Sequence, residues 1–511
     1  MQTNRKSTTI LERYSDRIHG VLHCYDRLIF TGTLPVLCYA EGMTAYLKAR
    51  DIRIFDYPKF AEPLRDMIRK TADTIAEETG LSIEFIRKNT FRKEERIKRI
   101  IDERGDHPGM VHIFSAMESC TSYKPWHDKA SGKTFLKHAD GKCLHYYFYL
   151  IDEELGLCYV RVPTWCPFRL QIYCNGHAIL ARRLSKAGVA FSVAENAFYS
   201  IADMAKAQPF ADQITGERIH HILDRLARRF STAANALSLS YHWSIMQAEY
   251  STDIMFRRQE DLQSFYPFLL ETVIHSVKPE NIATFLGQKL HPRYLGEMGS
   301  NFNVRMEGSR VKHTMGPVSV KVYDKRACIL RIETTVNDVS FFKDFRAVEH
   351  RDGTGEVKWT KMKKNIYSLA PLRDVLRGSN QRYLEFLSQL DTPESGVKDL
   401  ERIAESLTHN DHCYKGFNLF KAEDASLFRL LLCGQWSIYG VTAYALHKMF
   451  PEKSSGQVYR LLKRFRVHGF LRKVPHCYRY HLTDLGRRVA ALCVKLREMV
   501  VIPHLAWGNI G

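Results

Sequence analysis

The sequence predicts an α+β protein of several domains, in which a mixed α/β body with a helical insert precedes a small C-terminal module of helices and one hairpin. The chain has 511 residues, 45% hydrophobic and 12% aromatic, which is enough to build several cores of ordinary size. Runs rich in aromatic and β-branched residues alternate with amphipathic helical patterns, as in layered α/β proteins. A helix-rich segment with one hairpin closes the chain. We expect regions at 1–140, 141–390 and 415–511.

The charge balance favours a polyanionic partner. The 75 Lys and Arg against 56 Asp and Glu give a formal net charge of +19, which attracts nucleic acid. The sequence contains no signal-peptide pattern and no apolar run of the roughly 18 residues that a membrane span needs. We therefore expect no membrane partner and a cytoplasmic, bacterial protein.

The cysteines indicate reduced thiols rather than a disulfide framework, because the 12 of them include no C-x-x-C pair. Cys166, Cys174 and His177 form a cluster in the chain, and the latter two are close enough to share a zinc ion. Buried thiols beside a strand are the alternative.

The N-terminal region mixes strands and helices. The run 20–30 predicts a strand, 61–78 a helix that Gly80 ends, and 91–105 a helix with charges of both signs. Segment 115–141 is polar, with Lys-Pro, Ser-Gly-Lys and Asp-Gly steps, so we expect a long exposed loop. Long loops in compact proteins are often functional, which makes this segment a candidate binding loop.

The central region contains two predicted hairpins. Residues 143–162 and 317–336 each hold two strand-like runs around a charged turn. Between them, Asn175 suits the N-cap of a helix, and 217–230 has an apolar stripe opposite several arginines. This arginine face is either solvated or in contact with phosphates. Helix is also expected over 241–258 and on to 290.

The C-terminal module has the predicted order helix, helix, helix, hairpin, helix, at 424–433, 441–450, 455–467, 470–482 and 485–501. From Lys453 to Arg497, 12 basic residues stand against one acid, Asp484. Such an imbalance on a small module is typical of binding to a phosphate backbone.

The string QVYRLLKRFRVHGFLRKV, followed by YRYHLTDLGR, resembles the recognition helix, wing and next helix of MarR-like winged helix-turn-helix DNA-binding domains. The resemblance is confined to the C-terminal module; a small dimeric regulator of that kind lacks the large body upstream. It implies a helix in the major groove and a wing along the backbone or minor groove. The DNA-contacting residues it implies are Ser455, Gln457, Arg460, Lys463 and Arg464 of the helix and Lys473, His476 and Arg479 of the wing. A winged helix that contacts protein is the alternative.

A shorter resemblance concerns the second hairpin, whose Val-Tyr-Asp-Lys and Leu-Arg-Ile-Glu runs loosely resemble strands of plasmid and phage rolling-circle replication initiators. It implies that Asp324 and Glu333 bind Mg²⁺ or Mn²⁺. It also implies that a tyrosine, Tyr323 or alternatively Tyr250, attacks a phosphodiester bond. The His-x-His pair that such nickases use does not occur. Salt bridges to neighbouring basic residues are the alternative for both carboxylates.

The predicted helix at 241–258 offers another candidate catalytic group. His242, Glu249 and Asp253 fall at i, i+7 and i+11 on one helical face. They would complete a metal site or supply a general base. Polar surface or buried hydrogen bonding is the alternative.

The function expected from the sequence is that of a nucleic-acid-binding protein of a mobile element or replicon, which binds duplex DNA and acts as a metal-dependent endonuclease or nickase. A non-enzymatic winged-helix transcriptional regulator is one alternative. A structured-RNA-binding protein is another, because aromatic and basic residues interleave at 146–169 and aromatic rings stack on unpaired bases. Core packing also explains these rings. The sequence lacks a G-x-x-x-x-G-K-[ST] loop, so we do not expect a nucleotide-driven motor.

Overall fold

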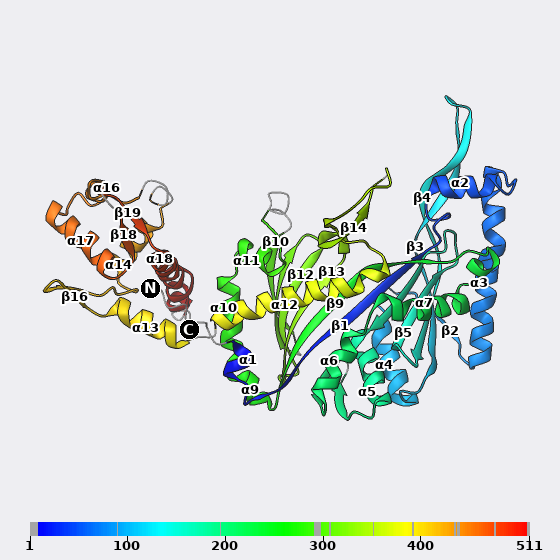
Figure 1. Ribbon diagram of the computed structural model, residues 1–511, viewed down its shortest axis with the longest axis horizontal. Helices are drawn as coiled ribbons and strands as arrows, with labels where there is room; N and C mark the ends of the chain where they lie inside the picture. Colours follow the sequence, from blue (N-terminus) through cyan, green and yellow to red (C-terminus); the bar gives the residue numbers. More distant parts are fainter. Residues whose placement is uncertain are drawn as a thin grey trace. The chain divides into compact units, whose positions relative to one another are not determined.

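The protein has two compact units, residues 1–391 and 392–511, shown as a computed structural model in Figure 1. The structure describes residues 9–507 except 89, 195, 291–297, 306–307, 351, 391–392, 434–435, 437–439 and 475–476. Each unit has its own hydrophobic core. The fold is therefore mixed α and β, as expected from the sequence.

The first unit is built around an eleven-stranded mixed sheet with the order β10-β11-β12-β13-β9-β1-β6-β5-β4-β3-β2. Neighbouring strands are antiparallel, except β2 and β3, which are parallel. Because β1 pairs with β9 and β9 with β13, segments far apart in the chain lie side by side. The strands are β1 (Ile18–Thr33), β2 (Ile83–Phe85), β3 (Gly109–Asp128), β4 (Lys133–Asp152), β5 (Gly156–Pro163), β6 (Leu170–Asn175), β9 (His242–Phe256), β10 (Met298–Arg305), β11 (Gly308–Met315), β12 (Val318–Lys325) and β13 (Ile329–Val336).

Helices and two small ribbons surround this sheet. The long helix α12 crosses one face and packs on β9 and β13 (Figure 1). The ribbons are β7 (Phe191–Ala194) with β8 (Ala197–Ile201), and β14 (Lys343–Glu349) with β15 (Gly355–Lys361). The helices are α1 (Ile10–Arg13), α2 (Ala40–Lys48), α3 (Tyr57–Thr79), α4 (Lys93–Arg104), α5 (Gly176–Lys186), α6 (Met204–Asp212), α7 (Gly216–Phe230), α8 (Thr232–Ala236), α9 (Gln259–Gln263), α10 (Tyr266–Ser276), α11 (Pro279–Phe285) and α12 (Leu369–Leu390).

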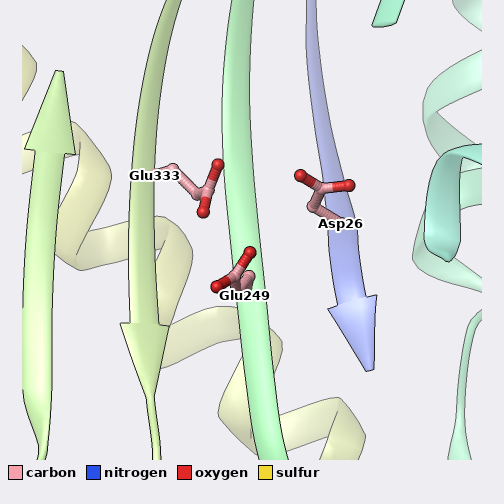
Figure 2. Close-up of side chains that lie close together, drawn as sticks. All are labelled: Asp26, Glu249 and Glu333. Carbon is pink, nitrogen blue, oxygen red and sulfur yellow. The ribbon is translucent and has the colours of Figure 1, made fainter. Parts of the chain in front are cut away.

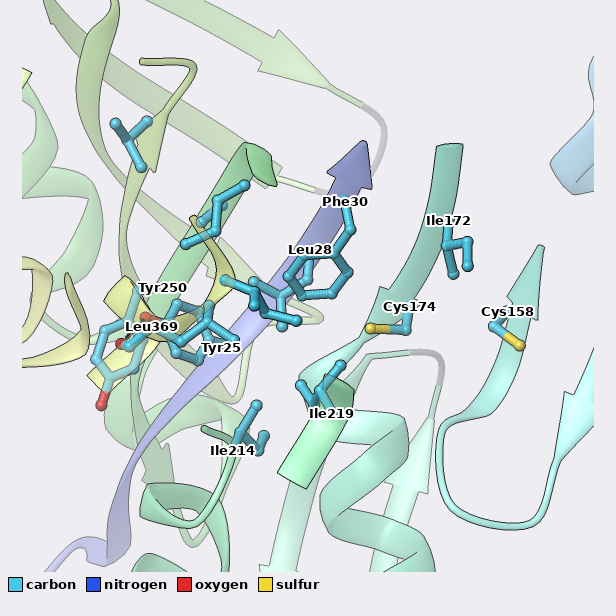
Figure 3. Close-up of a cluster of buried hydrophobic side chains, with 14 of the residues drawn as sticks. Tyr25, Leu28, Phe30, Cys158, Ile172, Cys174, Ile214, Ile219, Tyr250 and Leu369 are labelled. Carbon is cyan, nitrogen blue, oxygen red and sulfur yellow. Dashed lines mark hydrogen bonds between the residues drawn. The ribbon is translucent and has the colours of Figure 1, made fainter. Parts of the chain in front are cut away.

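The side chains of β1 alternate between an apolar face and a polar face of the sheet. Leu28 and Phe30 are fully buried in the core that Figure 3 shows. Tyr25 also enters this core, where it donates a hydrogen bond to the carbonyl of Leu369 (2.6 Å) and packs edge-on against Tyr250. The residues of β1 between these positions therefore face the other side of the sheet.

Local sequence signals placed many elements correctly. The strand expected at 20–30 lies in β1, and the helix expected at 61–78 lies in α3, where Gly80 is the C-cap with a φ of 64°. Asn175 caps α5 by accepting from two backbone N–H groups, and 217–230 forms α7. Both predicted hairpins are confirmed as β4–β5 and β12–β13.

Two predicted elements are wrong. Segment 115–141, expected to be a loop, lies almost entirely in β3 and β4, which pair along their whole length and project beyond the sheet as a ribbon (Figure 1). The helix expected over 241–258 is strand β9 instead. Most of its second half is buried on both faces, so the apolar residues do not alternate and the period is ambiguous.

The second unit follows the expected order of helices and hairpin. Its core collects Phe417, Phe428, Phe465 and Phe470. Its elements are α13 (Pro393–Ala404), β16 (Leu407–His409), β17 (His412–Tyr414), α14 (Ala422–Leu431), α16 (Ala443–Met449), α17 (Ser455–Val467), β18 (Leu471–Lys473), β19 (Tyr480–Leu482), α18 (Asp484–Lys495), a π-helical stretch (Leu496–Val501) and α19 (Ile502–Trp507). Among the helices described in either unit, none is long and apolar enough to cross a membrane.

Candidate metal centre

Three carboxylates meet on the polar face of the sheet. Asp26 lies on β1, Glu249 on β9 and Glu333 on β13, which are three neighbouring strands. One oxygen from each lies within 4.8 Å of one oxygen from each of the others. Figure 2 shows the three side chains turned toward one another. We call these three residues the carboxylate centre.

A β-bulge places Asp26 in this group. Tyr25 pairs with Tyr250 and Leu28 with Ala248, so two residues of β1, the first of them Asp26, oppose one residue of β9, which is Glu249. A bulge re-aims the side chains of the strand that carries it and is common beside active sites. It brings Asp26 to the same face as Glu249.

The register of β13 supplies the third carboxylate. Glu333 pairs with Ser251, which is two residues from Glu249 on the same face of β9. Diagonal neighbours across a strand pair lie within reach of long side chains. Glu249 and Glu333 can therefore turn toward each other.

Asp26 is held by donors from three side chains, of which only Arg331 is fully buried. Its Oδ1 accepts from the side-chain amides of Asn175 (2.6 Å) and Asn196 (2.7 Å), and its Oδ2 lies 3.2 Å from Nη1 of Arg331. Burial alone would raise its pKa, but the neighbouring His177 and the charge of Arg331 hold that pKa well below its usual value. Asp26 is therefore ionised.

Arg331 belongs to a larger buried ion network. It pairs with Asp253 over 2.6 Å, and His177 lies between Asp253 (3.3 Å) and Asp26 (3.5 Å). Burial opposes the charge of Asp253, but Arg331 and His177 lower its pKa to about 2. Although burial works the other way, both aspartates raise the pKa of His177. Arg331 and His177 thus hold both aspartates in place.

Glu333 has two partners on β12. The hydroxyl of Tyr323 donates to Glu333 Oε2 over 2.7 Å, and Lys321 Nζ lies 2.5 Å from Oε1. Burial and the neighbouring Glu333 raise the pKa of Tyr323 well above its usual value. Glu333 is positioned to accept the proton of that hydroxyl.

Glu249 differs from the other two carboxylates. No Lys or Arg described in the structure forms an ion pair with it, and its recorded hydrogen bond comes from the hydroxyl of Thr335 (3.4 Å). Burial first, and then the charge of Glu333, raise its pKa to about 7. Unlike Asp26 and Glu333, it is only partly buried. Near neutral pH Glu249 is therefore only partly ionised, and a bound cation would displace its remaining proton.

The structure separates the two carboxylates that the sequence paired. Asp324 pairs with Leu330, whereas Glu333 pairs with Lys321, so Asp324 and Glu333 point to opposite faces of their hairpin. Asp324 accepts instead from Gln263 (3.3 Å) and from the backbone of Ser309 (3.2 Å). Glu333 remains in the centre and Asp324 does not.

The other candidate residues divide in the same way. His242 lies exposed at the start of β9, and Asp253 lies near its far end, about 36 Å away at the rise of an extended strand. Glu249 joins the carboxylate centre, and Asp253 joins the buried ion network. Tyr323 contacts Glu333, while Tyr250 packs on the opposite, apolar face.

The group suggested for zinc does not come together either. Cys174 pairs with Cys158 and both are buried in the apolar core (Figure 3). His177 contacts the two aspartates of the ion network instead. Among the residues that the structure describes, the carboxylate centre is the only group of three suited to a metal ion.

Asp26 is not among the site residues predicted from the sequence. Its one local signal is an Asp-Arg pair inside an otherwise apolar strand, in the run Val21 to Phe30. A charged pair in such a run indicates a bulge or a buried ion pair. The other two carboxylates of the centre, Glu249 and Glu333, lie more than 200 residues further along the chain.

In the second unit, most of the residues expected to contact DNA face solvent. Ser455, Gln457 and Arg460 of α17 are exposed, as are Lys473 and Arg479 around the β18–β19 hairpin. Lys463 is half-buried. Gln457 also completes a capping box, since its Oε1 accepts from the backbone of Ser454 over 2.7 Å. His476 lies outside the described residues.

Arg464 does not face outward as expected. It donates to the carbonyls of Lys415 (2.8 Å) and Gly416 (2.5 Å) and pairs with Asp424 (3.2 Å). Its guanidinium also lies 3.7 Å from the ring centre of Phe417. These contacts tie α17 to the segment that precedes α14, so Arg464 stabilises the unit internally.

The rings that suggested RNA binding are mostly core. Tyr146, Tyr147, Tyr149 and Tyr159 are all buried. Buried rings cannot stack on bases, so this observation no longer favours an RNA partner.

Function must be inferred from the carboxylate centre and from the charged surfaces. No family model, curated protein or solved structure matches the chain.

Proposed function

We propose that this protein cleaves phosphodiester bonds of nucleic acid at the carboxylate centre with a divalent cation, Mg²⁺ or Mn²⁺. The observation that carries the proposal is the meeting of Asp26, Glu249 and Glu333 from three neighbouring strands. Hard carboxylate oxygens suit these cations. The net charge of +19 favours a polyanionic substrate.

The charges around the centre leave one position for a cation. Asp26 faces Arg331 and Glu333 faces Lys321. Glu249 has no such ion pair among the described residues, and its carboxyl group ionises with a pKa of about 7. A bound cation would replace that proton and stabilise the ionised form of Glu249. A cation held by these carboxylates would supply Lewis-acid polarisation of a phosphoryl oxygen.

Tyr323 is the proposed nucleophile. Its hydroxyl donates to Glu333 over 2.7 Å, which is the geometry of a nucleophile beside its general base. Glu333 takes the phenolic proton as the tyrosine oxygen bonds to phosphorus. The bond from phosphorus to the leaving sugar oxygen breaks, and that oxygen takes a proton from water. Lys321 supplies positive charge beside the reacting group.

Duplex DNA binding by residues 392–511 is the second part of the proposal. The exposed side of α17 and the β18–β19 hairpin carry basic residues, including Arg460, Arg466, Arg472 and Lys473. A short helix beside a basic hairpin suits a major groove and its flanking phosphates. This unit would bring the carboxylate centre to its target.

The decisive experiment incubates the full chain with labelled single- and double-stranded DNA and RNA, with Mn²⁺, with Mg²⁺ and with chelator. We expect cleavage that needs the metal and is lost in Glu249→Gln. The matched control Glu217→Gln alters an exposed carboxylate of α7 and should cleave normally. Asp324→Asn should also cleave, because Asp324 lies on the opposite face. Binding without cleavage in every protein would contradict the proposal and favour the non-enzymatic regulator.

DNA binding is tested separately with Arg460→Gln and Lys473→Gln in the full chain. Loss of one phosphate contact should lower duplex affinity and reduce the slope of log affinity against log salt by about 0.9. Unchanged affinity in both variants would remove α17 and its hairpin from the binding surface.

A further inference from the structure

Two β-ribbons of the first unit carry the same pattern of cross-strand pairs. They are β14–β15 and the outer part of β3–β4, and both point upward in Figure 1. In each ribbon a pair of lysines faces each other across the strands. A Trp opposite a Phe forms the next pair on the same face, nearer the turn.

The β14–β15 ribbon shows the pattern in its most exposed form. Lys343 pairs with Lys361, and two residues further along each strand Phe345 pairs with Trp359. Alternation puts all four side chains on one face. Phe345 is 60% exposed and Trp359 67%, with ring centres 5.7 Å apart. This face is therefore an exposed aromatic surface, with a pair of lysines at the end of the ribbon away from its turn.

Such a face destabilises the folded ribbon when no partner is bound. Like charges directly opposite each other on paired strands are destabilising. Within the described part of the chain, neither Lys343 nor Lys361 forms an ion pair that would offset their repulsion. A partner with an anion beside the lysines would offset their repulsion, and a flat apolar surface on the same partner would cover the exposed rings.

The β3–β4 ribbon repeats this arrangement independently. Lys124 pairs with Lys137, and Trp126 pairs with Phe135 on the same face. Trp126 is 43% exposed. Lys137 Nζ lies 3.8 Å from the centre of the Trp126 ring, so here the cation rests on the aromatic surface.

We propose that these two ribbons bind single-stranded nucleic acid, with bases stacked on the Trp and Phe rings and phosphates held by the paired lysines. A nucleotide carries a planar base and a phosphate anion. The distance between them is similar to the distance between the lysine pair and the next pair, Trp and Phe, on the same face of a ribbon. The partner is single-stranded because bases inside a duplex do not present their faces. The inference rests on the proposed function only in taking nucleic acid as the partner.

The test measures binding of the full-length protein, in chelator, to a fluorescein-labelled mixed-sequence 20-nucleotide DNA and RNA and to the corresponding duplex. Base–aromatic stacking contributes about 1–3 kcal/mol per base, so Phe345→Ala/Trp359→Ala should weaken single-strand binding at least about five-fold. Lys343→Gln/Lys361→Gln should reduce the salt slope on single strands by about 1.4. Duplex binding should change little in both.

Three controls separate stacking from damage to the ribbon. Phe345→Tyr/Trp359→Phe keeps both rings and should retain affinity. Phe55→Ala removes an equally exposed Phe, 63% exposed and outside both ribbons, and should have no effect. Trp126→Ala should weaken single-strand binding in the same direction as Trp359→Ala.

Two outcomes would overturn the inference. One is unchanged single-strand affinity in Phe345→Ala/Trp359→Ala. The other is binding to vesicles of phosphatidylglycerol, lost in that variant, without single-strand binding. The binding measurement is made in chelator, so it does not depend on the proposed metal chemistry. The cleavage assay in turn does not depend on binding by the two ribbons, so each proposal can fail without the other.

Discussion

Arg331 donates from Nε and Nη2 to the two carboxylate oxygens of Asp253, each over 2.6 Å, across the paired strands β13 and β9. Neither side chain reaches solvent. Removing one member of a buried pair leaves the other charge buried and uncompensated, which costs about 3–5 kcal/mol. Arg331→Met should lower the free energy of unfolding of the first unit by this amount, measured by urea denaturation.

An exposed pair provides the comparison for this prediction. Lys364 Nζ lies 3.1 Å from Asp338, and its side chain is 56% exposed. Lys364→Met should cost at most about 1 kcal/mol. Equal losses in the two variants would show that the buried network does not stabilise the sheet.

The Arg331–Asp253 pair could not be predicted from the local sequence. Local signals such as the Asn175 cap and the αL residue Gly80 were read correctly, because a cap or a turn depends on a few neighbouring residues. The partner of Arg331 depends on which strand lies beside β13. That strand is β9, and we had expected a helix over residues 241–258.

The error over Asp324 has a different origin. The hairpin was predicted, but its register was not, and a shift of one residue exchanges the two faces of a strand. The observed register, with Lys321 opposite Glu333, turns Asp324 away. Asp26 was missed because two distant strands bring the other carboxylates to it, and the residues around it carry only the Asp-Arg pair as a signal of the bulge.

Glu249 should make stability depend on pH. Burial and Glu333 raise its pKa from 4.5 to about 7 in the folded protein. A carboxyl group with a raised pKa favours folding while it is protonated, so this contribution is complete below about pH 4.5 and is lost as pH rises through 7. The loss is at most about 3–4 kcal/mol.

The check compares Glu249→Gln with the unaltered protein by denaturation between pH 4.5 and 8. The amide cannot ionise, so stability should fall less with rising pH in the variant. Addition of Mn²⁺ should stabilise the unaltered protein more at pH 8 than at pH 6, because the cation competes with a proton. Parallel pH profiles with and without the substitution would refute the assigned pKa.

Tyr323→Phe tests the proposed nucleophile directly. The substitution removes one hydroxyl, and with it the hydrogen bond to Glu333. If Tyr323 attacks phosphorus, a labelled substrate should form a covalent adduct with the protein that survives denaturing electrophoresis, and Tyr323→Phe should form none. Cleavage retained at the normal rate in Tyr323→Phe would instead indicate that water is the nucleophile.

Arg464 and Arg460 lie one helical turn apart on α17, yet they should respond differently to substitution. Arg464 holds two carbonyls and Asp424 inside the second unit, and its side chain is only 18% exposed. Arg464→Gln should therefore lower the melting temperature of that unit, and any loss of duplex affinity should follow from unfolding. Arg460 is exposed, so Arg460→Gln should weaken duplex binding without changing the melting temperature. The two effects are separated by thermal melting alongside binding below the transition, and an Arg464→Gln protein that melts normally but fails to bind DNA would restore Arg464 to the DNA-contacting surface.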